Sequence, residues 1–482
     1  MSNPSVTHFT LESPDFPCTD LQIRELHAKE QISRLFEVEL LVVVPESSAL
    51  DVNAILGAGA TVVASASGEE KRRIHGIVAE AIDLLDSEPG TRSYRLRLVP
   101  RAFRMTLVRT QEAFVNLPIQ KILEQKLGLV GLDDTRFLLN DEYEPREFVT
   151  QYDETDLDFV SRLAENLGWS YAFDHSSDRD RLVFTDRSGS LGTAVPPVEA
   201  TFRGRGTETG VFRLELATRL VPSTYVVSDY NYLTPRVDLA KAHELPNGYA
   251  GGVVEFGTNH RTPEEGALFA RVRAEETAGQ HAVYRGEADL CTLAAGATLK
   301  LLHHPRLGDV ELLITSVEHH ASQVVMGFGG EGGAPGYRAT FTAIPASVPH
   351  RPARSTPKPK IQGLMTGIVE TPAGVKQRSP WIDEHGRYLV RLLFDTSASG
   401  RPTPSLPIRM VQANAGAGYG THFPLRPGTE VAVGFVGGDP DRPIIVGAAA
   451  NALTPSPVVD RDAVFHRVTT SSGISMELND GT

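Results

Sequence analysis

The chain has 482 residues, which is too long for one ordinary hydrophobic core and predicts about three domains. Its residues are 41% hydrophobic and 22% charged, a composition typical of globular proteins. The formal net charge of -13 argues against non-specific binding to nucleic acid or to an anionic membrane. The 43 glycines and 32 prolines favour many turns and short strands over long helices.

Cys18 and Cys291, the two cysteines, lie far apart in the sequence. They predict neither a disulfide framework nor a metal site, and they fit folding in a reducing compartment. No basic segment followed by an apolar stretch opens the chain, so we expect no cleavable signal peptide. The apolar run at 36–44 is too short to span a bilayer.

The first hundred residues predict β-structure. Apolar or alternating runs at 35–44, 60–67, 72–85 and 92–100 are separated by glycine, serine and proline, as expected of short strands and their turns. The segment 117–129 then carries apolar residues at helical spacing. It predicts a short amphipathic helix that ends at Gly128.

The segment 151–175 carries clear helix-boundary signals. Thr155 followed by Asp158 forms a capping box, and Gly168 is the expected end of the helix. The apolar runs that follow, at 169–175 and 181–186, predict a β-hairpin.

The segment 261–279 predicts another helix. Thr262 is the expected N-cap, Glu265 completes its capping box and Gly279 ends it. The acidic residues of its first turn favour the positive end of a helix, so we expect no catalytic role for them.

Residues 345–360 are rich in proline and basic residues and contain almost no apolar ones. This composition predicts an extended, polyproline-type linker and the main domain boundary. A nucleic-acid-binding arm is the alternative, but no aromatic residues interleave with its cations.

The segment from Ile361 to about Asn451 predicts a compact all-β domain. Five short strands within it suit a small Greek-key barrel of the OB type. We expect these strands at 363–370, 386–395, 406–413, 429–436 and 443–450. The last is almost continuously apolar, as expected of a strand covered on both faces.

Several patterns that resemble reactive sites have simpler explanations. The glycine-rich run at 416–420 is followed by prolines and a strand, so the strand-loop-helix context of a phosphate-binding loop is missing. No G-x-S-x-G elbow of a serine hydrolase is present. Asp383 and Glu384 are adjacent in an apparent turn, and adjacency alone does not predict an acid/base pair.

Histidine pairs occur at His303–His304 and at His319–His320. Neighbouring residues of a strand point to opposite faces, so neither pair offers two ligands together. One histidine from each pair could still meet across strands. No metal-binding motif supports such a site, so we predict none.

The stretch between the last two predicted strands carries glycines beside two carboxylates. Asp439 suits the first position of a turn, Pro440 the second and Arg442 the last, while the glycines allow unusual dihedral angles. We therefore predict a structural turn without a ligand. The residues of this signature turn are Gly438, Asp439, Pro440, Asp441, Arg442 and Pro443.

Segment 428–451 resembles the signature of the VgrG family, the spike of the type VI secretion system, in which a G-D-P-D-R-P turn joins two strands of an OB-like domain. Segments 381–395 and 414–428 are similar to the entry strand and the following loop of that domain. Segment 148–173 is similar to the family's Q-Y-x-E-T helix, whose domain resembles the hub of contractile phage tails, and 260–276 fits the same template. The resemblance covers almost the whole chain.

The resemblance implies a β-rich α+β fold with four regions. These are a phage-tail-hub-like region of two β-barrel-like subdomains with inserted helices (1–344), the linker (345–360), an OB-fold domain (361–455), and a neck with the start of a trimeric β-helical needle that is cut short (456–482). Two departures from the family pattern are a missing tryptophan in the strand at 405–412 and a missing W-D-R in the loop at 395–405.

The resemblance also implies a structural, non-enzymatic spike. A homotrimer would cap the inner tube of Hcp-like hexamers, carry a PAAR-like tip protein or effectors, and bind baseplate components. It would contact the target membrane transiently when the sheath contracts. The protein would assemble in the cytoplasm and then be exported by the machine to the extracellular space or a target cell. No cofactor, metal, catalytic residue or nucleic-acid partner is expected.

Three other functions remain as alternatives. The departures from the family pattern keep open a spike or hub of a phage tail or of an extracellular contractile particle. A lysozyme-bearing tail protein is disfavoured, because only about twenty residues separate Asn451 from needle-like sequence, too few for a catalytic domain. An OB-fold nucleic-acid binder is disfavoured by the acidic charge and by the lack of an aromatic and basic platform.

Overall fold

The structure, a computed structural model, describes residues 7–85, 90–204, 209–325, 336–372, 379–396 and 406–481. The chain forms two compact units. Unit 1 comprises Met1–Val108, Ile119–Tyr143 and Thr155–Pro357, and unit 2 comprises Arg109–Pro118, Glu144–Glu154 and Lys358–Thr482. Two short segments from the first third of the chain therefore belong to the C-terminal unit. Nothing in the domain boundaries predicted above anticipates this.

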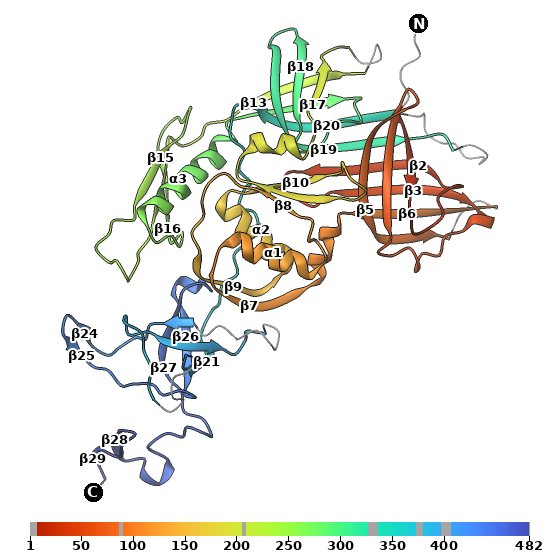
Figure 1. The fold of residues 1–482 in the computed structure, drawn as a ribbon. Helices are drawn as coiled ribbons and strands as arrows, with labels where there is room; N and C mark the ends of the chain where they lie inside the picture. Colours follow the sequence, from red (N-terminus) through yellow and green to blue (C-terminus); the bar gives the residue numbers. More distant parts are fainter. Residues whose placement is uncertain are drawn as a thin grey trace. The chain divides into compact units, whose positions relative to one another are not determined.

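Unit 1 is built on one large, mostly antiparallel sheet (Figure 1). Its strands are β1 (Thr7–Glu12), β2 (Gln22–Gln31), β3 (Glu37–Pro45), β4 (Gly59–Ala66), β5 (Glu69–Leu84), β6 (Thr91–Val99), β12 (Val198–Thr201), β13 (Val211–Thr218), β17 (Ala282–Ala288), β18 (Thr298–His304), β19 (Gly308–Ser322) and β20 (Gly336–Pro345). Their order is β1-β4-β5-β6-β3-β2-β19-β20-β17-β13, with β18 beside β19 and β12 beside β18. The β-strands predicted in the first hundred residues are confirmed.

The pairing of β2 with β19 joins the first strands of unit 1 to its last ones. Each side of this junction has its own hydrophobic core. On β3, Val38, Leu40 and Val42 are fully buried on one face, whereas Glu39 is exposed on the other. Burial of each such side chain contributes roughly 1.5–3 kcal/mol, which fixes the register of the strand.

Smaller elements complete unit 1. They are α1 (Ile119–Leu129), α2 (Asp156–Leu167), α3 (Pro263–Ala278), β8 (Arg136–Leu138), β10 (Ser170–Asp174), β11 (Arg181–Thr185), β14 (Thr224–Ser228), β15 (Lys241–Glu244) and β16 (Gly252–Phe256), with short 3₁₀ turns η1 (Glu46–Ser48), η2 (Arg101–Leu107) and η3 (Ser188–Thr193). Strands β10 and β11 form the predicted hairpin. Helix α3 lies along the sheet β15-β14-β16 (Figure 1). None of the helices in the described ranges has the length and apolar character needed to cross a membrane.

The predicted helix boundaries are largely confirmed. Thr155 caps α2 by accepting a hydrogen bond from the N–H of Asp158, and Gly168 ends the helix with φ 72°. Thr262 caps α3 in the same way. The predicted end of α1 at Gly128 is wrong, because this glycine lies inside the helix. The left-handed residue comes later, at Gly131 with φ 76°.

Unit 2 is centred on a five-stranded sheet of order β23-β22-β21-β26-β27. Its elements are β7 (Arg109–Leu117), β9 (Arg146–Thr155), β21 (Met365–Glu370), β22 (Tyr388–Leu392), β23 (Leu406–Ile408), β24 (Ala415–Gly416), β25 (Tyr419–Gly420), β26 (Glu430–Phe435), η4 (Val436–Gly438), β27 (Pro443–Ala448), η5 (Asp460–Asp462), β28 (Phe465–Thr469) and β29 (Ser475–Asn479). The five predicted OB strands are thus present. The paired strands β7 and β9 were not predicted, and Ala113 and Phe148 from them join the core of this sheet.

Three expectations for unit 2 have different outcomes. Strand β27 is not covered on both faces within the chain, because Val446 is 48% exposed. Strands β28 and β29 form an antiparallel hairpin, and the needle that they would begin remains a prediction. Most of the loop at 395–405 lies outside the described residues, at 397–405.

Gly168 and Gly279 both follow helices but differ in backbone conformation and surroundings. Gly168 has φ 72°, and a Cβ added to it would lie 2.5 Å from Cγ1 of Val272. Gly279 has φ -60°, and a Cβ added to it would lie 3.6 Å from the nearest atoms, the carbonyl oxygens of Glu275 and Glu276. Gly168→Ala should therefore lower the free energy of unfolding by roughly 1–3 kcal/mol, measured by chemical denaturation.

Gly279→Ala is the matched control. Its backbone already suits alanine, so the free energy of unfolding should stay the same or rise by up to about 1 kcal/mol. Equal losses in the two variants would contradict the role assigned to the left-handed conformation of Gly168.

Candidate functional site

The signature turn connects β26 to β27 through two left-handed glycines. Gly437 has φ 66° and Gly438 has φ 77°, a conformation that other residues rarely adopt. The N–H of Asp439 donates to the carbonyl of Val436, and the N–H of Arg442 donates to the carbonyl of Asp439 at 2.9 Å. Asp439 and Arg442 therefore occupy the first and last positions of a turn.

Both carboxylates of this turn have partners that the sequence did not reveal. The Nζ atom of Lys358 lies 2.5 Å from Oδ1 of Asp439 and 2.7 Å from Oδ2 of Asp441. Thr150 on β9 donates its N–H to Oδ1 of Asp441 at 2.7 Å and its hydroxyl to the carbonyl of Pro440 at 3.0 Å. We call these five residues the turn clamp.

The turn clamp ties together three places in unit 2 that are far apart in the sequence and belong to two of its three segments. It joins β9, the start of Lys358–Thr482 and the turn after β26. The side chains of Asp439 and Asp441 are only 16% and 7% exposed, so their charges need a nearby cation. The two carboxylates are thus used in holding the fold. The only sequence signal for the clamp was that Lys358 lies in a basic segment.

The pair Asp383 and Glu384 does not form an acid/base site. Asp383 accepts hydrogen bonds from the N–H groups of His385 and Arg387, and from Nε of Arg387 at 2.6 Å. Burial alone would raise the pKa of Asp383, but these bonds hold it below its usual value. Glu384 is 85% exposed, so the two carboxylates lie in different surroundings.

The histidines of the two adjacent pairs in the sequence also lie in different surroundings. His304 packs against Phe202 at a ring distance of 4.4 Å. His319 is buried, whereas His320, on the opposite face of β19, is exposed and stacks on His27.

His319 belongs to a buried ionic cluster in the sheet of unit 1. A guanidinium nitrogen of Arg72 lies 2.6 Å from Oε2 of Glu30, and Nε2 of His319 lies 3.4 Å from Oε1 of Glu30. Burial alone would raise the pKa of Glu30, but Arg72 and His319 outweigh it and hold the pKa well below its usual value. In this cluster the negative charge of Glu30 is therefore balanced by the positive charge of Arg72.

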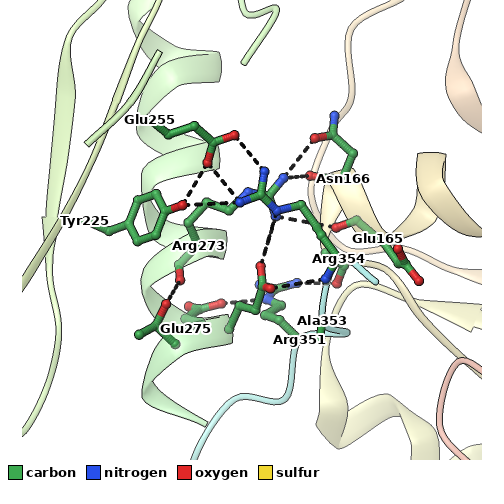
Figure 2. A network of polar contacts seen from close by, with 12 residues as sticks. Glu165, Asn166, Tyr225, Glu255, Arg273, Glu275, Arg351, Ala353 and Arg354 are labelled. Carbon is green, nitrogen blue, oxygen red and sulfur yellow. Dashed lines mark hydrogen bonds and ion pairs between the residues drawn. The ribbon is translucent and has the colours of Figure 1, made fainter. Parts of the chain in front are cut away.

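The basic segment at 345–360 is not a free arm. Its N-terminal part docks on unit 1 through a polar network (Figure 2). Arg351, 5% exposed, lies 2.6 Å from Oε2 of Glu275 and also donates to the carbonyl of Gly168. Arg354 lies 2.6 Å from Oε1 of Glu255.

The same network contains further contacts. Tyr225 accepts a hydrogen bond from Arg354 at 3.2 Å, and the N–H of Thr356 donates to Glu165 at 2.9 Å. Nearby, the buried Arg273 donates to the carbonyl of Asn166 at 2.6 Å (Figure 2). With Arg351, Arg354 and Lys358 all in ion pairs, the segment offers few free cations to a nucleic acid. The extended linker at 345–360 stays a prediction, and partly buried glutamates hold two of its arginines against unit 1.

Comparison with known proteins identifies the architecture. Residues 29–325 match the family model described as "Phage tail baseplate hub (GPD)". The chain belongs to the phage tail baseplate hub family. Residues 383–449 of this hub protein match a second model, described as "Type VI secretion system/phage-baseplate injector OB domain".

Several curated relatives of this hub protein carry the name VgrG. It is 30% identical over 440 residues to "Type VI secretion system spike protein VgrG1c" of Pseudomonas aeruginosa, which covers 90% of this chain and 60% of that protein. It is 29% identical over 401 residues to "Actin cross-linking toxin VgrG1" of Vibrio cholerae, covering 80% of this chain and 36% of that protein. The chain thus spans about three-fifths of the first relative and a smaller share of the second.

Two solved structures share this fold over most of the chain. The E. coli c3393 protein, titled a component of the type VI secretion system similar to the T4 tail proteins gp27 and gp5, has a TM-score of 0.66 and 24% identity. That match covers 92% of this chain and 99% of the other. The PdpA-VgrG complex has a TM-score of 0.64 and 10% identity, covering 99% of this chain and 93% of the other.

Asp441→Ala should weaken unit 2. The change removes the acceptor for the N–H of Thr150 and one of the two carboxylates around Lys358. We expect the free energy of unfolding to fall by roughly 1–3 kcal/mol. Hydrogen exchange of peptides covering Glu144–Glu154 should speed up at the same time, because β9 loses one of its attachments.

Asp441→Asn keeps an oxygen for Thr150 but loses the charge, so its effect should be intermediate. Asp460→Ala, at an exposed aspartate of the same unit, is the control and should change stability by less than about 0.5 kcal/mol. If Asp441→Ala behaves like Asp460→Ala, the turn clamp does not support the fold.

Arg72→Met should leave the carboxylate of Glu30 buried without its main counter-charge. At neutral pH the free energy of unfolding should fall by about 3–5 kcal/mol. Without Arg72, burial raises the pKa of Glu30 above its value in the unfolded chain, so the folded state binds the proton more readily. The loss should therefore shrink as the pH is lowered, which denaturation at several pH values measures.

The adjacent arginine provides the control. Arg73 is 36% exposed and pairs with Glu12 and Glu70 at the surface. Arg73→Met should cost less than about 1 kcal/mol. A loss for Arg72→Met that is as small as this, or that does not depend on pH, would argue against a buried charge pair.

Proposed function

We propose that this chain is the hub and spike of a contractile injection machine of the type VI secretion class. One observation carries the proposal: the hub match at 29–325 and the injector OB match at 383–449 follow each other on one chain. Relatives with about 30% identity over 90% of the chain are named type VI secretion spike proteins. The role is structural, and the signature turn serves it by holding the OB sheet together.

The proposed working form is a homotrimer. Leu364 and Val446 are 59% and 48% exposed, and a Cβ on Gly434 would lie within 3.5 Å of both side chains, so they form one apolar patch. The hairpin β28–β29 exposes Ile474, Met476 and Leu478 by 61–71%. Copies of the chain around an axis would bury these surfaces, which an isolated protein rarely leaves in water.

The proposed partners follow from this role. The trimer would cap an inner tube of Hcp-like hexamers, bind baseplate components and carry a PAAR-like tip protein or an effector. The solved PdpA-VgrG complex supports the idea that a protein of this fold binds a further protein. We propose assembly in the cytoplasm and export by the machine, with transient contact to the target membrane.

A hub or spike of a phage tail, or of an extracellular contractile particle, is the second candidate. The shared family description, which names phage baseplates, favours it. An enzymatic spike has less support. The relative named as an actin cross-linking toxin is matched over only 36% of its length.

Val446→Asp tests the proposed assembly. Light scattering of the purified chain should give the mass of three chains, and the variant should shift the population toward monomers because a carboxylate cannot be buried between apolar surfaces. Val237→Asp, at a 45% exposed valine of unit 1, is the control and should stay trimeric. A wild-type chain that remains monomeric at all concentrations would overturn the trimer.

A gene-deletion experiment in cells distinguishes a machine of the type VI secretion class from a phage tail or an extracellular particle. A strain lacking the gene should stop secreting the tube protein, and the wild-type chain should restore secretion while Val446→Asp should not. Normal secretion in the deletion strain together with loss of tail-like particles would favour the phage or extracellular particle. Release of peptidoglycan fragments by the purified chain would instead favour an enzyme.

A further inference from the structure

Two histidines and a glutamate converge on the solvent-facing side of the large sheet of unit 1. Glu318 and His320 are two residues apart on β19, so their side chains lie on the same face. His27 on β2 is directly opposite His320 in the register of the two strands. The opposite face carries Val317 and the buried His319, so the fold fixes which side each residue takes.

The ligand atoms of these three side chains are close together. Nε2 of His27 lies 3.9 Å, and Nε2 of His320 lies 3.8 Å, from Oε2 of Glu318. One ligand atom from each residue can be chosen so that all three lie within 4.8 Å of one another. The two imidazole rings stack with centroids 4.3 Å apart and planes inclined by 16°.

We propose that His27, Glu318 and His320 form a binding site for a divalent transition-metal ion of the Zn²⁺ type. Imidazole nitrogens and a carboxylate oxygen are ligands that Zn²⁺ prefers, at distances of about 2.0–2.2 Å. Tetrahedral coordination at those distances places ligand atoms roughly 3.4 Å apart. The two spacings to Glu318 need to contract by roughly half an ångström, and the stacked rings need to tilt so that both nitrogen lone pairs point at the ion. Rotation of the half-exposed side chains supplies both changes.

One ligand atom of this cluster lacks a hydrogen-bond partner in the described part of the chain. Nε2 of His27 is buried and has no hydrogen-bond partner among the described residues. A metal ion would satisfy it.

The surroundings leave room for further ligands. His27 and His320 line a hollow of about 460 Å³ that also contains Glu25, Glu39 and Arg338. The guanidinium of Arg338 is held by Glu287 at 2.6 Å, which reduces its repulsion of a cation. Three protein ligands leave a fourth position for water or for a group from another molecule.

The test is a titration of the full, untagged chain with Co²⁺ after treatment with a chelator. We expect one Co²⁺ per chain, visible absorption bands of a nitrogen-ligated ion, and displacement by Zn²⁺. His27→Gln and His320→Gln should each weaken binding by more than the roughly 10–100-fold expected for losing an outer-sphere partner. Glu318→Gln should weaken it as well.

His8→Gln, at an exposed histidine on β1 of the same sheet, is the matched control and should bind Co²⁺ as the wild type does. Thermal unfolding adds a second measurement, in which Zn²⁺ should raise the melting temperature of the wild type but not of the double variant His27→Gln/His320→Gln. The proposal is wrong if the wild type binds neither ion, or if the double variant binds Co²⁺ as tightly as the wild type.

Discussion

The contact of Lys358 with Asp439 and Asp441 fixes the signature turn of unit 2 against the start of Lys358–Thr482. The chain enters this unit three times, as Arg109–Pro118, Glu144–Glu154 and Lys358–Thr482. Two carboxylates at one turn would repel each other in a half-buried place, and the lysine makes their proximity favourable. Thr150 adds hydrogen bonds from the second of the three segments, so the turn holds the second and third segments together.

The same principle recurs in unit 1. Glu30 on β2 is matched by Arg72 on β5, and Arg351 and Arg354 are matched by glutamates where the basic segment docks. In this acidic chain, some cations thus pair with carboxylates that are wholly or partly removed from water. Buried pairs of this kind give a fold directional constraints that apolar contacts lack.

Much of the local structure could be predicted from the sequence. The strand of Val38, Leu40 and Val42 follows from alternation, and α2 follows from Thr155 and Gly168. The end of α1 was placed wrongly, because a glycine can remain helical when a later one takes the left-handed position. Strands β7 and β9 were missed, since the OB core into which Ala113 and Phe148 pack is formed by strands far along the chain.

The sequence by itself determined the strand-rich character, the helix caps, the OB strands and the signature turn, because each depends on residues within a few positions of one another. Only the tertiary structure decided that Lys358 and Thr150 bind that turn, and that His320 faces His27 while His319 faces Glu30. These contacts join residues separated by tens to hundreds of positions. Strand register and chain crossings set them, and no local pattern records either.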